Sequence, residues 1–364
     1  MLPRALRRRY QTLRFLRQRS EPVSIGLRNQ WKMWRNGFFS QSYLVYRLDK
    51  NDPADYVTDD VQFRLAMLIN GYYAVALYDK LYQTLLLGCF PECVPPTHGL
   101  LRDGRLSFLG RSDSLPVAGL PDFLCCRRRL VLRPLTGNQG EGFYFLEQRD
   151  GAILLNSREI TEPELLRRAA SWQDYLVTDF IDQHPYSARI FPGSTNTVRI
   201  LTLWDDETQE PFVAAAVHRF GTEAIAPIDS WSRGGVAAGI HIETGRLRQA
   251  TPKPLREKPS FRSCHPDTGE RIEGVIIPHW ETVKHEVLRM AAALHFIPYI
   301  GWDIVVTEKG LQVIEANNGP GLILFQVHEP LLLRPRVRRF FEKHVERLSG
   351  PRAEKRQYKL PFKV

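Results

Sequence analysis

Residues 301–317 read Gly301-Trp-Asp-Ile-Val-Val-Thr-Glu-Lys-Gly-Leu-Gln-Val-Ile-Glu-Ala-Asn317, and they carry the clearest structural signal in the chain. Two runs rich in Ile and Val, residues 300–307 and 311–316, flank the polar tripeptide 308–310. That tripeptide ends in Gly310, and glycine readily takes the left-handed conformation that short hairpin loops use. The pattern predicts an antiparallel hairpin with a three-residue loop.

The same hairpin is expected to bring three oxygen-bearing side chains together. A three-residue loop sets a register that pairs Thr307 with Leu311, Val305 with Val313, and Asp303 with Glu315. Because side chains alternate between the faces of a strand, Glu315 and Asn317 project together, with Asp303 beside Glu315. Neighbouring carboxylates on an apolar hairpin repel each other, and a divalent cation cancels that repulsion. Oxygen ligands suit Mg²⁺, so a magnesium site is predicted here; a solvated cluster at the rim is the alternative.

Elsewhere the chain mixes helical and strand patterns with antiparallel neighbours, which indicates an α+β fold rather than a doubly wound parallel sheet. A Thr followed three residues later by a Glu predicts a helix that begins at Thr161 and ends near Ser171. An amphipathic helix is expected over residues 280–294. The expected strands are residues 129–135, 143–147, 175–181, 197–203 and 211–218.

A glycine-rich turn, Thr136-Gly-Asn-Gln-Gly-Glu-Gly142, joins the first two of these strands. Glycines let backbone N–H groups approach phosphate oxygens closely. The turn matches neither the P-loop nor the dinucleotide-binding fingerprint. Arg133 on the preceding strand and Lys80 far upstream are candidate cations for a phosphate. The alternatives are an ordinary flexible hairpin tip and two surface charges.

Charge and composition exclude several classes of protein. The 364 residues contain 50 Lys and Arg against 40 Asp and Glu, and the first twenty residues hold seven Arg and no acid. The positive charge is concentrated in one basic arm, while the rest of the chain is nearly neutral. A nucleic-acid-binding protein would instead spread positive charge over a folded face. No apolar run approaches the roughly 20 residues that a membrane-spanning helix needs. Five cysteines, no secretory signal and no disulfide framework predict a cytoplasmic protein with reduced thiols.

The basic arm itself has helical periodicity. Apolar residues recur along residues 2–19 with arginines on the other sides. Such a helix can lie on an anionic membrane surface or can dock on the core of its own protein. Both alternatives stay open from the sequence, so peripheral contact with the inner face of a membrane is one expectation. The oligomeric state is not predicted.

Several segments, taken together and in order, resemble the sugar-transfer-associated ATP-grasp family over roughly residues 60–340. The fold implied is a pair of α+β subdomains that clamp ATP, with an N-terminal helical extension. One difference is that this chain has Arg133-Pro134 where the family usually has Lys-Pro. The matching pieces are Asp79-Lys80, residues 130–142, Tyr175–Ile181, Asn196–Ile200, Asp229 with Gly234-Gly235, Gly301-Trp-Asp303 and Ile314–Asn317.

The resemblance also implies roles for individual residues. Contacts to the ATP phosphates fall on Lys80 and Arg133, with a loop that closes over them at Gly137, Asn138, Gln139, Gly140 and Gly142. The hinge against the adenine falls on Leu176, Val177, Thr178 and Asp179, with Asp182 toward the ribose. The Mg²⁺ ligands are Asp303, Glu315 and Asn317, and the groups facing the transferred phosphoryl are Arg199 and Arg219.

The activity implied is ATP-dependent ligation of a small-molecule carboxylate to an amine through an acyl phosphate, in the making of a cell-surface polysaccharide or related conjugate. One alternative is a kinase that uses the same grip on ATP. A second is a non-catalytic, membrane-associated nucleotide-binding module. The domains expected are residues 1–58 (basic helical arm), 59–127 (a region before the ATP-binding part), 128–180 (small subdomain), 181–345 (large subdomain) and 346–364 (tail).

Overall fold

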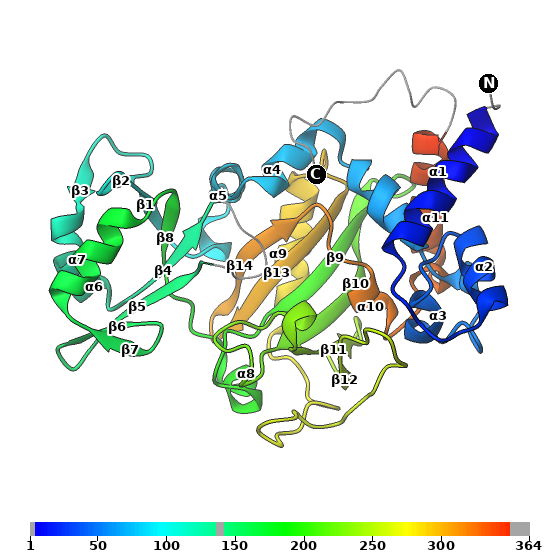
Figure 1. Ribbon diagram of the computed structural model, residues 1–364. Coiled ribbons are helices and arrows are strands. Elements are labelled where there is room, and N and C mark those ends of the chain that lie inside the picture. The colour runs from blue at the N-terminus through cyan, green and yellow to red at the C-terminus, as the bar shows by residue number, and fades with distance from the viewer. Residues whose placement is uncertain (1–3, 136–141, 350–364) are drawn as a thin grey trace.

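Two antiparallel sheets, each with its own core, make up the body of the protein (Figure 1). The computed structural model describes residues 4–135 and 142–349. The mixed helix and antiparallel sheet content confirms the predicted α+β class. The helices are α1 (Arg4–Arg19), α2 (Leu27–Arg35), α3 (Ser42–Val45), α4 (Val75–Tyr78), α5 (Lys80–Leu87), α6 (Leu120–Arg127), α7 (Glu162–Ser171), α8 (Pro185–Ile190), α9 (Trp280–Ala293), α10 (Ile323–Gln326) and α11 (Pro335–Ser349).

The small subdomain is built on an eight-stranded sheet in the order β3-β2-β1-β8-β4-β5-β6-β7. Helices α6 and α7 pack their apolar sides against it. Thr161 caps α7 by accepting a hydrogen bond from the backbone N–H of Glu164, as predicted. The strands are β1 (Thr97–Arg102), β2 (Arg105–Phe108), β3 (Ser114–Pro116), β4 (Arg129–Pro134), β5 (Tyr144–Arg149), β6 (Ala152–Leu155), β7 (Arg158–Ile160) and β8 (Tyr175–Asp179).

This sheet shifts the predicted domain boundary at residues 127 and 128. Strand β1 pairs with β8, and Leu101 and Leu124 share one buried core with Leu130. The small subdomain therefore begins near Thr97, and residues 59–96 pack with the large subdomain instead. Local sequence patterns could not show this, because the β1–β8 pairing joins segments far apart in the chain.

The large subdomain is built on a six-stranded sheet in the order β12-β11-β10-β9-β13-β14. Both faces are covered: α9 packs on one face, while α10, α11 and the N-terminal helices cover the other. Strand β13 is consequently buried along nearly its whole length. The strands are β9 (Val198–Asp205), β10 (Glu210–Phe220), β11 (Val236–Ile240), β12 (Leu247–Pro252), β13 (Tyr299–Thr307) and β14 (Gly310–Asn317).

The β13–β14 hairpin forms as predicted, but its tip has a different register. Thr307 faces Gly310, so the turn has two residues rather than three. A β-bulge then leaves Ile314 without a cross-strand partner and adds one residue to β14. Because of this bulge, Asp303 faces Glu315, as the sequence predicted. The predicted pairing is wrong at the tip and correct where the carboxylates lie.

The segment between the N-terminal helices and the small subdomain is irregular. It consists of a π-helical turn (Val61–Leu65), short 3₁₀ turns, α4 and α5. Asp79 starts α5 by accepting hydrogen bonds from the backbone N–H groups of Leu81 and Tyr82. At the other end, α11 continues to Ser349, so the predicted tail from residue 346 begins inside a helix. The rest of that tail lies outside the described residues.

The N-terminal unit, residues 4–58, is docked on the large subdomain rather than extended away from it. Leu16 of α1 is fully buried, and Met33 and Phe38 enter the same core as α11. Ser20 accepts hydrogen bonds from Trp34 and from the backbone of Ser40, which ties α1 to α2. No helix in the described ranges is both long and apolar enough to cross a bilayer.

A buried carboxyl group fastens this unit and makes stability depend on pH. Asp59 accepts hydrogen bonds from the backbone of Phe39 at 2.8 Å and from the Ser42 hydroxyl at 2.6 Å. Burial raises the pKa of Asp59 to about 6. Because this folded-state pKa lies above the unfolded value, folding favours the protonated form. Its stabilising contribution is present at acidic pH and is lost as pH rises through about 6.

We expect Asp59→Asn, which keeps an oxygen acceptor but cannot ionise, to remove this dependence. Between about pH 5 and about pH 8, the wild-type free energy of unfolding should fall by about 1 kcal/mol relative to that of the variant. Urea denaturation of both proteins at the two pH values measures the difference. Parallel pH profiles would contradict the assignment of a raised pKa to Asp59.

Candidate functional site

A cavity of about 620 Å³ lies between the two subdomains. Strands β4, β5 and β8 of the small sheet form one wall, and β9, β10, β13 and β14 form the other. Phe63 of the π-helical turn lines one side, and its ring packs at a tilt against Phe39 of the N-terminal unit. Two sheets and the π-helical turn therefore line one site, and the N-terminal unit packs behind it through Phe39. The predicted residues that line it are Lys80, Arg133, Thr178, Asp179, Arg199, Arg219, Asp303, Glu315 and Asn317.

Four of the predicted residues that the structure describes do not line this cavity: Gly142, Leu176, Val177 and Asp182. Leu176 and Val177 are buried inside the small sheet, where their backbone groups pair with β1 on one side and β4 on the other. These groups are not free to bind the edge of an adenine, so that expectation has to be corrected. Asp182 lies outside the cavity and forms an exposed ion pair with Arg129. The contact of Asp182 with a ribose is therefore also corrected.

The glycine loop is described only at its end. Gly142 has a φ of +73°, a conformation that favours glycine, and it lies near Pro134 and Tyr175. Its position follows from the β4–β5 pairing that the sequence predicted. The other four predicted loop residues, Gly137, Asn138, Gln139 and Gly140, lie outside the described residues.

Strand β8 reaches the cavity only at its end. The Asp179 carboxylate lies 2.7 Å from Nε2 of His98, and the next two residues, Phe180 and Ile181, line the cavity. Phe145 of β5 packs against Phe180, with ring centroids 6.1 Å apart. Phe143 lines the same wall. This aromatic surface, which sequence reasoning missed, is suited to a flat ring. The run Phe143-Tyr144-Phe145 was the signal that could have revealed it, because residues 143 and 145 project to the same face of an extended strand.

Two cations lie on the side of the cavity nearest Glu315. Lys80 Nζ donates a hydrogen bond to the Pro134 carbonyl at 3.0 Å, and Arg133 Nη1 donates to the Ile314 carbonyl at 2.7 Å. Arg133 Nε is buried without a hydrogen-bond partner. Burial lowers the pKa of both groups, while the charge of Glu315 opposes that shift. The bulge at Ile314 thus presents a carbonyl that holds Arg133 at the boundary between the subdomains.

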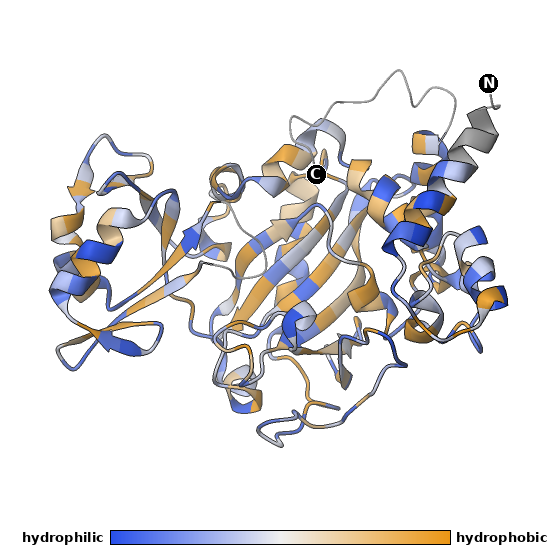
Figure 2. Ribbon diagram, in the orientation of Figure 1, coloured by the Kyte–Doolittle hydropathy of each residue, from blue (hydrophilic) through white to orange (hydrophobic). Residues whose placement is uncertain are grey.

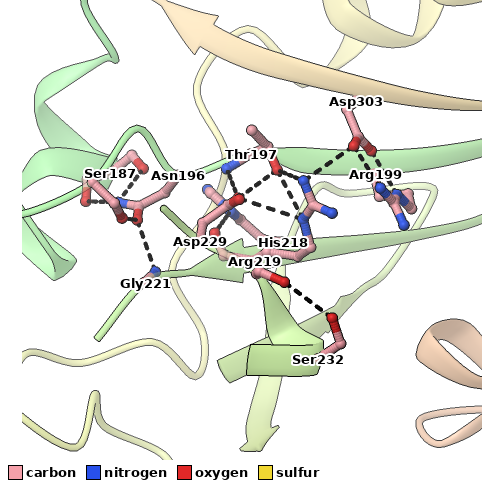
Figure 3. A network of polar contacts seen from close by, with 12 residues as sticks. Ser187, Asn196, Thr197, Arg199, His218, Arg219, Gly221, Asp229, Ser232 and Asp303 are labelled. Atoms are coloured by element: carbon pink, nitrogen blue, oxygen red, sulfur yellow. Dashed lines mark hydrogen bonds and ion pairs between the residues drawn. The ribbon is translucent and has the colours of Figure 1, made fainter. Parts of the chain in front are cut away.

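The centre of the site is a row of charged side chains across three neighbouring strands (Figure 3). Arg199 of β9 pairs with Asp303 of β13 through two hydrogen bonds of 2.5 Å, one to each carboxylate oxygen. Arg219 of β10 adds a third bond to Asp303 at 3.1 Å and lies 3.4 Å from Asp229. Asp229 in turn accepts from the backbone and hydroxyl of Thr197. These side chains meet because Asp303 and Arg199 face each other in the β9–β13 register.

Electrostatics distinguish the two carboxylates of the hairpin. Burial alone would raise the pKa of Asp303, but Arg199 and Arg219 outweigh that effect and lower it. The pKa of Glu315 is raised, first by burial and then by the charge of Asp303. Asp303 is therefore held ionised. The positive charges of Arg199, Lys80 and Arg133 lower the pKa of Glu315 but only partly offset these effects.

The three predicted magnesium ligands differ in availability. Asp303, Glu315 and Asn317 all line the cavity and present the oxygen donors that Mg²⁺ prefers. No described residue donates a hydrogen bond to Glu315, and Asn317 Nδ2 is buried without a partner. Both oxygens of Asp303, however, already accept hydrogen bonds from guanidinium groups. The three side chains thus present oxygen atoms that suit Mg²⁺, and Glu315 and Asn317 are the two that no described residue engages in a hydrogen bond.

A second layer of hydrogen bonds holds the loops around this row. Asn196 donates to the Phe191 carbonyl at 2.8 Å and accepts from Ser194 and from the backbone of Gly221. A Cβ at Gly221 would lie 2.4 Å from the Ser194 hydroxyl, so only glycine fits this close approach. The loop that carries Asp229 is consequently fixed against β9.

Comparison with known proteins agrees with this geometry. Residues 93–342 match the family described as sugar-transfer associated ATP-grasp. The chain belongs to that family. The ATP-grasp fold predicted from the sequence is thereby confirmed. No curated protein matches the chain.

Solved structures similar to this ATP-grasp chain are distant. The ATP-grasp ligase PsnB, complexed with a phosphomimetic variant of its minimal precursor, Mg and ADP, shares 15% identity over 76% of this chain and 61% of its own, with a TM-score of 0.38. PurK, an N5-carboxyaminoimidazole ribonucleotide synthetase in complex with ADP, shares 10% identity over 67% of this chain and 45% of its own, with a TM-score of 0.36. D-alanine–D-alanine ligase from Bacillus anthracis shares 12% identity over 75% of this chain and 70% of its own, with a TM-score of 0.37. The chain spans less than two thirds of the first two structures, and scores this low carry no argument about substrates.

The charged row predicts how the protein responds to loss of one partner. Arg199→Ala leaves Asp303 buried with only Arg219 opposite it. We expect the free energy of unfolding to fall by about 3 kcal/mol, since breaking a buried pair strands a charge. The double variant Arg199→Ala, Asp303→Asn should recover part of that loss.

Arg168→Ala is the matched control, because Arg168 forms an exposed pair with Glu164 within one helix. Its removal should change the free energy of unfolding by no more than about 0.5 kcal/mol. Chemical denaturation measures all three variants. Similar small losses for Arg199→Ala and Arg168→Ala would show that the charged row does not contribute to stability as described.

Proposed function

We propose that this ATP-grasp protein is an ATP-dependent ligase that joins a carboxylate to an amine through an acyl phosphate. The observation that carries the proposal is the convergence on one cavity of two cations, Lys80 and Arg133, with the side chains of Glu315 and Asn317, to which no described residue is hydrogen-bonded. A polyphosphate needs positive charges, which the two cations at the boundary between the subdomains supply. It also needs a bound Mg²⁺, for which the hairpin supplies oxygen ligands. The aromatic wall at Phe145 and Phe180 supplies a surface for the base.

Each group has a role in the proposed reaction. Lys80 and Arg133 bind phosphate oxygens, and Thr178 and Asp179 lie at the hinge end of the cavity. Glu315 and Asn317, with Asp303, would hold Mg²⁺, which neutralises charge on the phosphates when bound. Arg199 and Arg219 keep Asp303 ionised and place guanidinium groups at the cavity wall, where they face the transferred phosphoryl group.

The chemistry needs little covalent participation by the protein. An oxygen of the carboxylate attacks the terminal phosphorus of ATP, the bond to the bridging oxygen breaks, and ADP leaves. The amine then attacks the carbonyl carbon of the acyl phosphate, the carbon–oxygen bond breaks, and phosphate leaves as the amine loses a proton. Positioning and charge neutralisation supply most of the catalysis. The family's description supports a role in making a cell-surface polysaccharide or related conjugate.

We expect Glu315→Ala to reduce turnover by at least about a hundredfold, because it removes a main charge-bearing ligand from the phosphate site. The measurement is phosphate release from ATP by the purified protein against panels of acids and amines. Glu308→Ala is the matched control, since Glu308 lies exposed in the turn of the same hairpin. It should retain wild-type turnover.

The same assay separates the proposal from its rivals. A ligase releases phosphate only when an acid and an amine are both present. Consumption of ATP with a single acceptor and no phosphate release would identify a kinase instead. Near-normal turnover in Glu315→Ala would remove the metal-site assignment. Binding of ATP by the wild-type protein without turnover of any acid and amine would favour a non-catalytic nucleotide-binding module.

A further inference from the structure

The N-terminal unit holds most of the excess charge of the protein. The first 48 residues contain eleven Lys and Arg and a single acid, Glu21. The remaining 316 residues contain 39 Lys and Arg, which is 50 minus 11, and 39 Asp and Glu, which is 40 minus 1. Residues 1–48 therefore have a formal charge equal to the +10 of the whole protein. Residues 49–58, which complete the N-terminal unit, add one Lys and three Asp, so the sequence through residue 58 carries +8, which is 12 minus 4.

The exposed cations of this unit have no acidic partner. Among the described residues, no carboxylate pairs with the exposed bases of α1 and α2. The single acid, Glu21, is engaged elsewhere, with Arg256 of the large subdomain at 3.1 Å. The uncompensated bases are Arg14, Arg17, Arg19, Arg28, Lys32 and Arg35.

Apolar side chains lie exposed among these cations on α2. Leu27 is 85% exposed and Trp31 is 55% exposed, and their spacing of four residues places them on one side of the helix. Met33, on another side of α2, is buried against the protein, and the half-buried Trp34 beside Trp31 donates a hydrogen bond to Ser20. Hydrophobic and hydrophilic residues are mixed on α2 at the outer edge of the molecule (Figure 2). An exposed Trp and Leu between bases is the arrangement of a helix that lies in a membrane interface.

The structure changes which apolar residues are free for such contact. The sequence suggested that the apolar side of α1 could contact a membrane. In the structure Leu16 is buried, and the ring centroid of Phe15 lies 5.8 Å from that of Phe39. The C-terminal part of α1 is thus used to dock on the protein. The exposed apolar pair lies instead on α2, which borders α1.

We propose that the outward side of α2, with the neighbouring cations of α1, docks the protein on an anionic lipid surface. Leu27 and Trp31 enter the interface between headgroups and acyl chains, while Arg28, Lys32 and Arg35 contact acidic headgroups. Charge complementarity favours an anionic bilayer, because α1 and α2 carry six exposed bases without an acidic partner among the described residues and contain no acid of their own. This attachment is independent of the ligase reaction.

The test is sedimentation of the full-length protein with vesicles. The protein should bind equimolar phosphatidylcholine–phosphatidylserine vesicles and not pure phosphatidylcholine vesicles, and high salt should weaken the binding. The double variant Leu27→Glu, Trp31→Glu should weaken it by about tenfold or more. The triple variant Arg28→Glu, Lys32→Glu, Arg35→Glu should weaken it by about a hundredfold. All five positions are exposed, so the fold should tolerate these changes.

A matched control changes an equivalent exposed pair elsewhere. Tyr82 and Leu85 on α5 are 54% and 56% exposed, and Tyr82→Glu, Leu85→Glu should leave vesicle binding unchanged. No binding by the wild type would overturn the proposal, as would full binding by Leu27→Glu, Trp31→Glu. If the wild-type protein bound RNA at the same salt concentration and the triple variant did not, the surface would be assigned to nucleic acid. That result would equally overturn the proposal.

Discussion

The contact between Asp303 and two guanidinium groups is the constraint around which the site is arranged. Asp303 comes from β13, Arg199 from β9 and Arg219 from β10, so one carboxylate joins three adjacent strands of the large sheet. A buried carboxylate needs compensation, and here that compensation comes from side chains 104 and 84 residues away in the sequence. The same contact holds Asp303 ionised and places it in the cavity next to Glu315, which has no comparable partner.

The bulge at Ile314 has two consequences for the same site. It restores the pairing of Asp303 with Glu315 after a tip whose register differs by one residue. It also turns the Ile314 carbonyl toward Arg133, which comes from the small subdomain. One extra residue in a strand therefore links the two subdomains at the point where phosphate-binding groups are needed, in keeping with the frequent position of bulges beside functional sites.

The N-terminal unit supports the site from behind, through its contact with Phe63, and also forms an outer surface. Phe15, Phe39 and Phe63 pack in sequence, with centroids 5.8 Å and 5.5 Å apart, and Phe63 lines the cavity. Apolar burial on the second face of the large sheet explains this position, because that face would otherwise expose the strands to water. The unit consequently has an inner side that completes the fold and an outer side that carries most of the protein's excess charge.

Local patterns in the sequence determined the α+β class, the β13–β14 and β4–β5 hairpins, the cap at Thr161 and the pairing of Asp303 with Glu315. These features depend on alternation, turns and caps, which act over a few residues. Only the tertiary structure decided that β1 joins β8, that Arg199 and Arg219 engage Asp303, that Leu176 and Val177 are used up inside a sheet, and that Asp182 faces outward. Each of these depends on which distant strands become neighbours, and that choice is made by burial of the whole core rather than by any short segment.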